Sequence, residues 1–201
     1  MDRQHHPIQQ NNEQWYNLRA GRFTASSIKN LLMKESTKGY QDEIKRVAVE
    51  RTTGIPVEGG FQSFFMARGK TLEEYARRYY EAETFQVVSE GGFWTYGLDM
   101  GASPDGLVGD KGLIEIKCVK YNTMVDYLLG GKVPTDYYKQ IQHQLLVTDR
   151  EWCDFVGYYP GLRLMIKRVY PDHEMQGDIL EAVKEAIAKV NEIIPQIRIA
   201  S

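Results

Sequence analysis

Two acidic residues and a lysine lie near one another in the middle of the chain. Asp105 stands in the Ser-Pro-Asp-Gly sequence at 103–106, and Glu115 and Lys117 follow within the apolar run 113–119. Side chains alternate along a strand, so this run predicts Glu115 and Lys117 on one face and the two flanking isoleucines on the other. Two carboxylates and one ammonium group are therefore expected to share a site.

These groups suit the hydrolysis of a phosphodiester. Carboxylate oxygens bind hard cations such as Mg²⁺ or Mn²⁺, which also bind phosphate oxygens. In two-metal sites the ions lie roughly 4 Å apart, one activating a water and the other neutralising the departing 3′-oxygen. Lys117 is placed to position or deprotonate that water.

A simpler interpretation assigns these residues to a turn and a solvated strand edge. Pro, Asp and Gly are favoured in turns, and charged side chains are common on edge strands. However, Glu115 and Lys117 lie inside a strongly apolar strand and opposite an aspartate turn. This arrangement favours the nuclease interpretation.

The sequence resembles a known nuclease family. Asp105 followed by Glu-Ile-Lys at 115–117 is similar to the signature of the PD-(D/E)XK superfamily. Four segments have the order and spacing of the lambda-type phage exonucleases, also grouped as YqaJ-like viral recombinases. These segments are 18–27, 68–73, 102–107 and 137–142. The resemblance spans about residues 14–160.

The resemblance implies a fold and an activity. The expected fold is α/β, with a restriction-endonuclease-like core in which helices flank a mixed central sheet. The implied activity is Mg²⁺-dependent 5′-to-3′ exonuclease action that processively digests one strand of double-stranded DNA from 5′-phosphorylated ends. It leaves 3′ single-stranded overhangs for recombination by strand annealing. Implied partners are DNA ends, two further copies in a ring-shaped homotrimer and a single-strand annealing protein. The implied cofactor is two Mg²⁺ ions per active site, with Mn²⁺ as a substitute.

The resemblance also implies metal ligands. Asp105 and Glu115 would bind the metals, Lys117 would be the catalytic lysine, and Glu73 would reach the second ion from a helix. The main-chain carbonyl of Ile116 would be a further ligand. Without the family context, Glu73 would more often belong to the solvated face of a charged helix.

Gln140 takes the place of the family's helix glutamine, which implies contact with the attacking water or the scissile phosphate. It clusters at helical spacing with His143 and Gln144, and Ile141 and Leu145 lie on the other side of the same segment. An ordinary polar helix position is the alternative.

Arg19, Ser26 and Ser103 match the positions that hold the terminal 5′-phosphate in the family. Arginine presents a planar fork to phosphate oxygens, and Ser26 precedes a helix whose first N–H groups are free. Thr24 and Ser26 could instead cap that helix, a role compatible with phosphate binding.

Composition favours one nuclease domain over residues 1–201, with a flexible tail at 1–12 that includes His5 and His6 and a C-terminal helix at 172–196. No run approaches the roughly 20 apolar residues of a membrane span, so no membrane partner and a cytoplasmic location are expected. The resemblance implies that this cytoplasm is that of a bacterial host cell and that the protein is encoded by a phage or prophage. The two cysteines, Cys118 and Cys153, are expected to be buried thiols. A four-cysteine cluster site is excluded by their number.

The formal net charge of −2 is unusual for an enzyme of duplex DNA. We expect an asymmetric distribution, with a basic inner wall formed from clusters at 19–22, 29–38, 45–51 and 68–70. Acidic residues dominate 172–192.

The remaining pattern predicts alternating elements, typical of an α/β sandwich. Expected helices lie at 13–20, 25–33, 41–53, 62–81, 123–129, 134–147 and 172–194. Expected strands lie at 85–89, 92–96, 101–102, 113–119, 152–159 and 164–170. The long C-terminal helix is amphipathic and is expected to cover the core.

Two other functions remain open at this point. One is an endonuclease on the same fold, of restriction or junction-resolving type. The other is a catalytically silent module that binds DNA ends. A terminal-phosphate pocket is needed only by an end-directed protein, and intact Asp105, Glu115, Lys117 and Glu73 count against a silent one.

Overall fold

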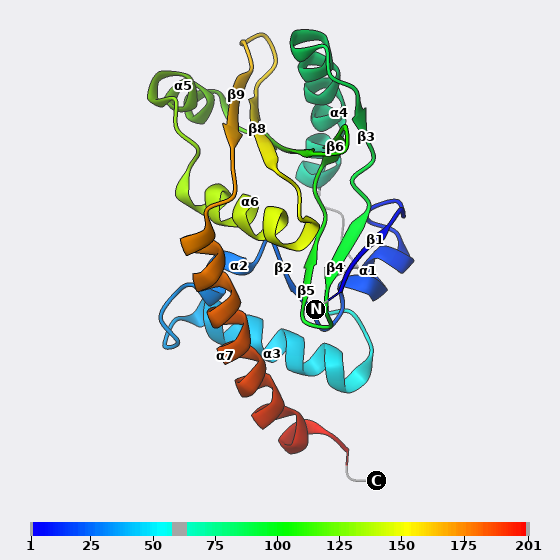
Figure 1. Cartoon of the computed structure of the whole chain (residues 1–201). Helices are drawn as coiled ribbons and strands as arrows, with labels where there is room; N and C mark the ends of the chain where they lie inside the picture. Colours follow the sequence, from blue (N-terminus) through cyan, green and yellow to red (C-terminus); the bar gives the residue numbers. More distant parts are fainter. Residues whose placement is uncertain (1, 58–63, 200–201) are drawn as a thin grey trace.

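The computed structural model describes residues 2–57 and 64–199, with the backbone alone over 64–70. Its helices are α1 (Glu13–Arg19), α2 (Ile28–Leu31), α3 (Lys38–Thr53), α4 (Phe64–Thr84), α5 (Tyr121–Gly130), α6 (Thr135–Thr148) and α7 (His173–Ile197). Its strands are β1 (Arg3–His6), β2 (Phe23–Thr24), β3 (Val88–Ser89), β4 (Phe93–Tyr96), β5 (Met100–Ala102), β6 (Gly106–Val108), β7 (Gly112–Cys118), β8 (Trp152–Tyr158) and β9 (Met165–Val169). Figure 1 shows their arrangement.

The strands form two mixed sheets with helices around them, which confirms the α/β fold class. One sheet has the order β3-β6-β7-β8-β9, and the other has the order β1-β4-β5-β2. The chain passes from the second sheet to the first between Ala102 and Gly106. The sequence predicted one continuous sheet here. Pro104 lies at the break, where its missing N–H cannot extend a strand ladder.

The sheet of β7 is covered on both faces (Figure 1). Ile114 and Ile116 pack on one face against Ala76 and Tyr80 of α4. On the other face, Leu113 and Phe155 pack with Ile141 of α6. The predicted alternation along β7 is therefore confirmed, and Glu115 lies on the α6 side.

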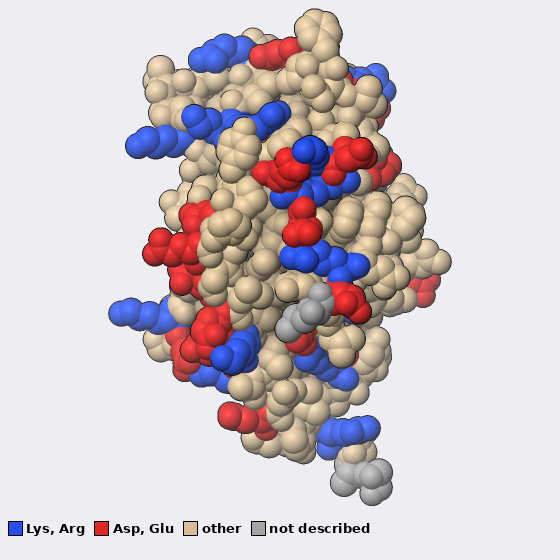
Figure 2. Space-filling view, in the orientation of Figure 1, with Lys and Arg blue, Asp and Glu red and all other residues tan. Residues whose placement is uncertain are grey.

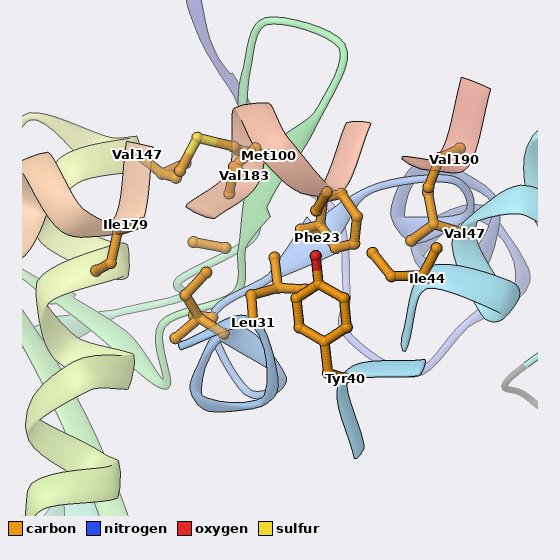
Figure 3. Close-up of a cluster of buried hydrophobic side chains, with 14 of the residues drawn as sticks. Phe23, Leu31, Tyr40, Ile44, Val47, Met100, Val147, Ile179, Val183 and Val190 are labelled. Carbon is orange, nitrogen blue, oxygen red and sulfur yellow. The ribbon is translucent and has the colours of Figure 1, made fainter. Parts of the chain in front are cut away.

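A second apolar cluster joins β2, α3, α6 and α7. Figure 3 shows Phe23 surrounded by side chains of these helices, including Ile44, Val183 and Val190. The C-terminal helix thus covers a core, as its amphipathic pattern predicted. It begins after Asp172, whose side chain accepts a hydrogen bond of 3.1 Å from the Met175 N–H.

The N-terminal residues differ from the predicted flexible tail. Arg3–His6 form β1 and pair antiparallel with β4, from Arg3 opposite Tyr96 to His6 opposite Phe93. The His5 ring also stacks on Trp94 at a centroid distance of 4.3 Å. A polar strand of this kind is held mainly by its main chain, so its sequence carries little apolar alternation.

Both cysteines are free thiols, as predicted; Cys153 is buried and Cys118 is half-buried. Among the described residues, no helix combines the length and the apolar character needed to cross a membrane.

Candidate active site

Asp105 is joined directly to β7. Its main-chain N–H donates to the Ile114 carbonyl at 3.2 Å, and its Oδ2 accepts from the Ile116 N–H at 2.6 Å. The pairing of Gly106 with Ile114 sets this register. The turn therefore holds the Asp105 carboxylate beside the strand that carries Glu115.

Glu115 is 1% exposed, yet three side-chain donors satisfy its carboxylate. Lys117 and Gln140 both contact Oε1, the Gln140 amide at 2.6 Å. Gln144 donates to Oε2, also at 2.6 Å. A buried carboxylate needs such charge-assisted bonds to offset its lost hydration. The two glutamines lie one turn apart on α6, which fixes the orientation of the carboxylate.

In the sequence, only the four-residue spacing from Gln140 distinguishes Gln144. The structure places both amides on Glu115, whereas His143 points elsewhere and its Nε2 lies 3.1 Å from the Gly101 carbonyl oxygen. The signal was the i, i+4 repeat, because residues four apart share a helix face. Gln144 thus joins the predicted set as a residue that orients Glu115.

Lys117 remains protonated in this arrangement. Burial opposes its charge, but the carboxylates of Glu115 and Asp105 outweigh that effect and raise the pKa of Lys117 above its usual range. Its Nζ also lies 5.2 Å from the centre of the Tyr137 ring. An ammonium group held this way can donate to a water or a phosphate oxygen, which favours positioning over proton abstraction.

The surroundings of Asp105 disfavour its charged form, whereas those of Lys117 favour the charged form. Burial, followed by the nearby charges of Glu115 and Glu73, raises the pKa of Asp105 well above the usual value. A cation placed among these groups would relieve the repulsion. The oxygen donor set therefore fits a hard divalent cation.

The three carboxylates do not form a closed cage. Asp105 and Glu73 line one hollow of about 960 Å³, and Asp105 and Glu115 line a separate pocket of about 200 Å³. Within the described part of the chain, no three His, Cys, Asp or Glu side chains are arranged to hold a metal ion. Mg²⁺ requires less, since it commonly binds one or two carboxylates and retains waters and phosphate oxygens.

The smaller pocket unites the two predicted groups of functional residues. Its lining includes the catalytic candidates Asp105, Glu115, Lys117 and Gln140. It also includes the phosphate-binding candidates Arg19, Ser26 and Ser103. Five parts of the chain therefore meet at this pocket: α1, the segment before α2, the 103–105 turn, β7 and α6.

The phosphate-binding candidates are connected through Trp15. Its indole Nε1 donates to Ser103 Oγ at 2.7 Å, and the guanidinium of Arg19 lies 4.2 Å from the centre of its ring. Arg19 also donates to Thr24 Oγ1 at 3.5 Å, and Thr24 Oγ1 lies 3.4 Å from Ser26 Oγ. The arginine, two hydroxyls and the pocket wall thus form a polar recess.

The alternative capping role for Thr24 and Ser26 is wrong. The N-cap residue of α2 is Ser27, and even its side chain makes no capping hydrogen bond. Ser27 Oγ instead donates to Glu43 Oε1 at 2.5 Å. The hydroxyl of Ser26 is left on the exposed side, facing the pocket.

Several basic residues that cluster in the sequence have structural partners. Arg46 is bound between the buried carboxylates of Glu43 and Glu50, and Arg51 pairs with Asp99 at 2.7 Å. Charges of both signs are interspersed on the face shown in Figure 2. The cluster at 45–51 therefore contributes less to a basic surface than its sequence indicated. A basic inner wall stays a prediction.

Comparison with known proteins identifies the class of the fold and then the family. The fold matches that of an alkaline exonuclease and is of the PD-(D/E)XK type. The YqaJ-like viral recombinase domain matches residues 14–151. The chain belongs to the YqaJ-like viral recombinase family.

Three solved structures illustrate the relationship. The alkaline exonuclease LHK-Exo of Laribacter hongkongensis is 34% identical, with a TM-score of 0.83 over 92% of this chain and 96% of that one. Its complex with dAMP gives a TM-score of 0.82 at the same identity and coverage. A phage-related exonuclease of Haemophilus somnus 129PT, 15% identical, shares the fold with a TM-score of 0.65 over 90% of this chain and 99% of that one. Among curated proteins, none matches.

Proposed function

We propose that the protein is a Mg²⁺-dependent exonuclease that digests one strand of double-stranded DNA in the 5′-to-3′ direction from 5′-phosphorylated ends. The supporting observation is the single pocket of about 200 Å³ that contains both the phosphate-binding and the catalytic candidates. A terminal phosphate in the recess of Arg19 would place the next phosphodiester toward Asp105 and Glu115. Family membership and the similarity to an alkaline exonuclease support the same activity.

The metal ligands in this proposal are Asp105, Glu115 and the Ile116 carbonyl, with Glu73 toward a second ion. When bound, the divalent ions supply an activated water and neutralise charge on the leaving oxygen. Mn²⁺, with similar ligand preferences, is expected to substitute for Mg²⁺.

The chain's own residues orient the reaction. Gln144 fixes Glu115, and Lys117, kept protonated by the carboxylates, donates to the attacking water or to a non-bridging phosphate oxygen. Water attacks phosphorus, and the bond to the 3′-oxygen of the terminal nucleotide breaks. The products are a 5′-mononucleotide and a strand with a new 5′-phosphate, which fits the recess of Arg19 again.

The same proposal includes the assembly. A ring-shaped homotrimer around DNA and a single-strand annealing partner follow from the family resemblance. Such a ring would allow processive digestion, and the 3′ overhang is the substrate that an annealing protein requires.

A comparison of DNA ends tests this function. Linear duplex with 5′-phosphates, linear duplex with 5′-hydroxyls and closed circular duplex are incubated with Mg²⁺ or with EDTA. We expect fast release of mononucleotides from the 5′-phosphorylated duplex, slow release from the 5′-hydroxyl duplex, and none from the circle or with EDTA. Efficient cutting of the circle would establish the endonuclease alternative. Binding of ends without cleavage of any substrate would establish the catalytically silent one.

A further inference from the structure

A short segment outside the family match, residues 7–11, borders both hollows. Gln10 and Asn11 line the small pocket of Arg19 and Glu115 and also the larger hollow of Glu73. Asp105 is the other residue common to the two linings. The segment therefore lies where the two hollows meet, beside the central carboxylate of the site.

The segment is held at both ends. On one side, β1 is paired along β4, and the Ile8 N–H donates to the His6 carbonyl at 2.8 Å. On the other side, Asn12 caps α1 by accepting a hydrogen bond of 2.8 Å from the Trp15 N–H. A five-residue connection fixed in this way can hold a side chain at a defined position.

Gln10 contacts the turn that carries Asp105. Its Nε2 donates to the Pro104 carbonyl at 2.8 Å. That carbonyl belongs to the peptide group whose N–H is Asp105's own, and this N–H donates to Ile114. Because a peptide group is planar, the two hydrogen bonds together fix its rotation and hence the direction of the Asp105 side chain.

Each residue of the turn is held from a different segment. Trp15 of α1 donates to the Ser103 hydroxyl, Gln10 donates to the Pro104 carbonyl, and Arg77 of α4 donates to the Asp105 carbonyl at 2.7 Å. Arg77 is also paired with Glu90 at 2.9 Å. The carbonyl of the Pro104–Asp105 peptide thus accepts a hydrogen bond from the amide of Gln10. This amide is neutral, so it adds no positive charge beside a cation site.

We propose that Gln10 is a positioning residue for Asp105. The proposal rests on the proposed function for its catalytic consequence, but the effect of Gln10 on the turn is independent of DNA cleavage. The segment lies before the family domain at 14–151, so it adds a support to the active site that the domain itself does not contain.

The test compares Gln10→Met with Gln4→Met. Methionine matches glutamine in length and lacks the amide donor, and Gln4 is an exposed residue of β1 that lines neither hollow. Loss of one such hydrogen bond is expected to weaken Mn²⁺ binding, measured calorimetrically without DNA, by about three- to tenfold. We expect a similar fall in kcat with little change in KM, and faster hydrogen exchange of the 103–106 turn. Gln4→Met should show none of these effects.

A third variant separates positioning from space-filling. Gln10→Lys retains an N–H donor of similar reach, and at saturating Mn²⁺ it is expected to recover most of the kcat lost in Gln10→Met. Equal losses in the two variants would overturn the proposal, as would unchanged Mn²⁺ affinity and unchanged exchange of the turn in Gln10→Met. A lower melting temperature as the sole effect would also overturn it. If the wild type fails to cut DNA, the proposed function fails, whereas hydrogen exchange still tests Gln10.

Discussion

The N–H of Ile116 donates a hydrogen bond of 2.6 Å to Oδ2 of Asp105, which ties the turn to the central strand β7. The Ile116 side chain packs in the α4 core while its main chain serves the site. Loss of this bond would therefore let the carboxylate of Asp105 move relative to Glu115. This bond helps to explain how side chains ten positions apart line one pocket.

Removing either carboxylate should abolish cleavage and leave DNA binding intact. We expect Asp105→Ala and Glu115→Gln each to lower kcat at least about 10³-fold, or about 4 kcal/mol of transition-state stabilisation. Asp110→Asn, an exposed acid in the turn between β6 and β7, is the matched control and should behave like the wild type. Cleavage rates and duplex binding are measured together. Wild-type digestion by either site variant would refute the assignment.

Lys117→Met should separate catalysis from metal binding. We expect kcat to fall at least about 10²-fold, because the donor to the water or phosphate is lost. Mn²⁺ affinity should stay the same or rise, since Lys117 no longer competes for Glu115. Calorimetry without DNA and single-turnover cleavage measure the two effects. Lys111→Met, an exposed lysine, is the control; a loss of Mn²⁺ affinity in Lys117→Met would contradict the positioning role.

Arg19→Ala should reduce the preference for a phosphorylated end. The guanidinium lies over Trp15 and lines the pocket, so its removal takes a charged fork from the phosphate recess. We expect the ratio of kcat/KM for 5′-phosphate over 5′-hydroxyl duplex to fall about tenfold or more. The ratio for Arg19→Lys should lie between those of the wild type and Arg19→Ala. Arg163→Ala, at an exposed loop position, should give the wild-type ratio. An unchanged ratio in Arg19→Ala would exclude this role.

Stability should fall at acidic pH because of His143. Burial lowers the pKa of this residue to about 4, so the folded protein keeps the imidazole neutral where an unfolded chain would already bind a proton. The stabilisation is complete above pH 6.5 and is lost as the pH falls toward 4, by up to about 3 kcal/mol. His143→Gln should flatten this part of the pH profile in urea unfolding. His173 is exposed, so His173→Gln should leave the pH profile of stability unchanged. If His143→Gln also has the wild-type profile, burial of His143 does not control it.

The sequence predicted the central strand and its alternation of faces well. The alternation around Glu115 was strong enough to place Ile114 and Ile116 on one face of the strand and Glu115 on the other, as observed. The long helices also end close to their predicted limits. These features depend on local periodicity, which the sequence displays directly.

Other features depend on contacts that no local pattern reveals. Polar β1 is held by main-chain pairing and by stacking of His5, so it resembled a tail. Helix α2 spans residues 28–31, shorter than the predicted 25–33, and the side chain of its N-cap residue Ser27 donates to Glu43 without capping the helix. Glu73 and Glu115 line different hollows, which only Asp105, Gln10 and Asn11 share. These features depend on contacts between residues that are distant in the sequence.

The proposed reaction requires metal binding by the carboxylates of this pocket. A crystal soaked in Mn²⁺ and measured at the manganese absorption edge tests it most directly. We expect anomalous density next to Asp105 and Glu115, with a second peak toward Glu73, and its loss in Glu115→Gln. Manganese bound only elsewhere on the molecule, with Glu115 still held by Lys117, Gln140 and Gln144 alone, would contradict the proposed metal site.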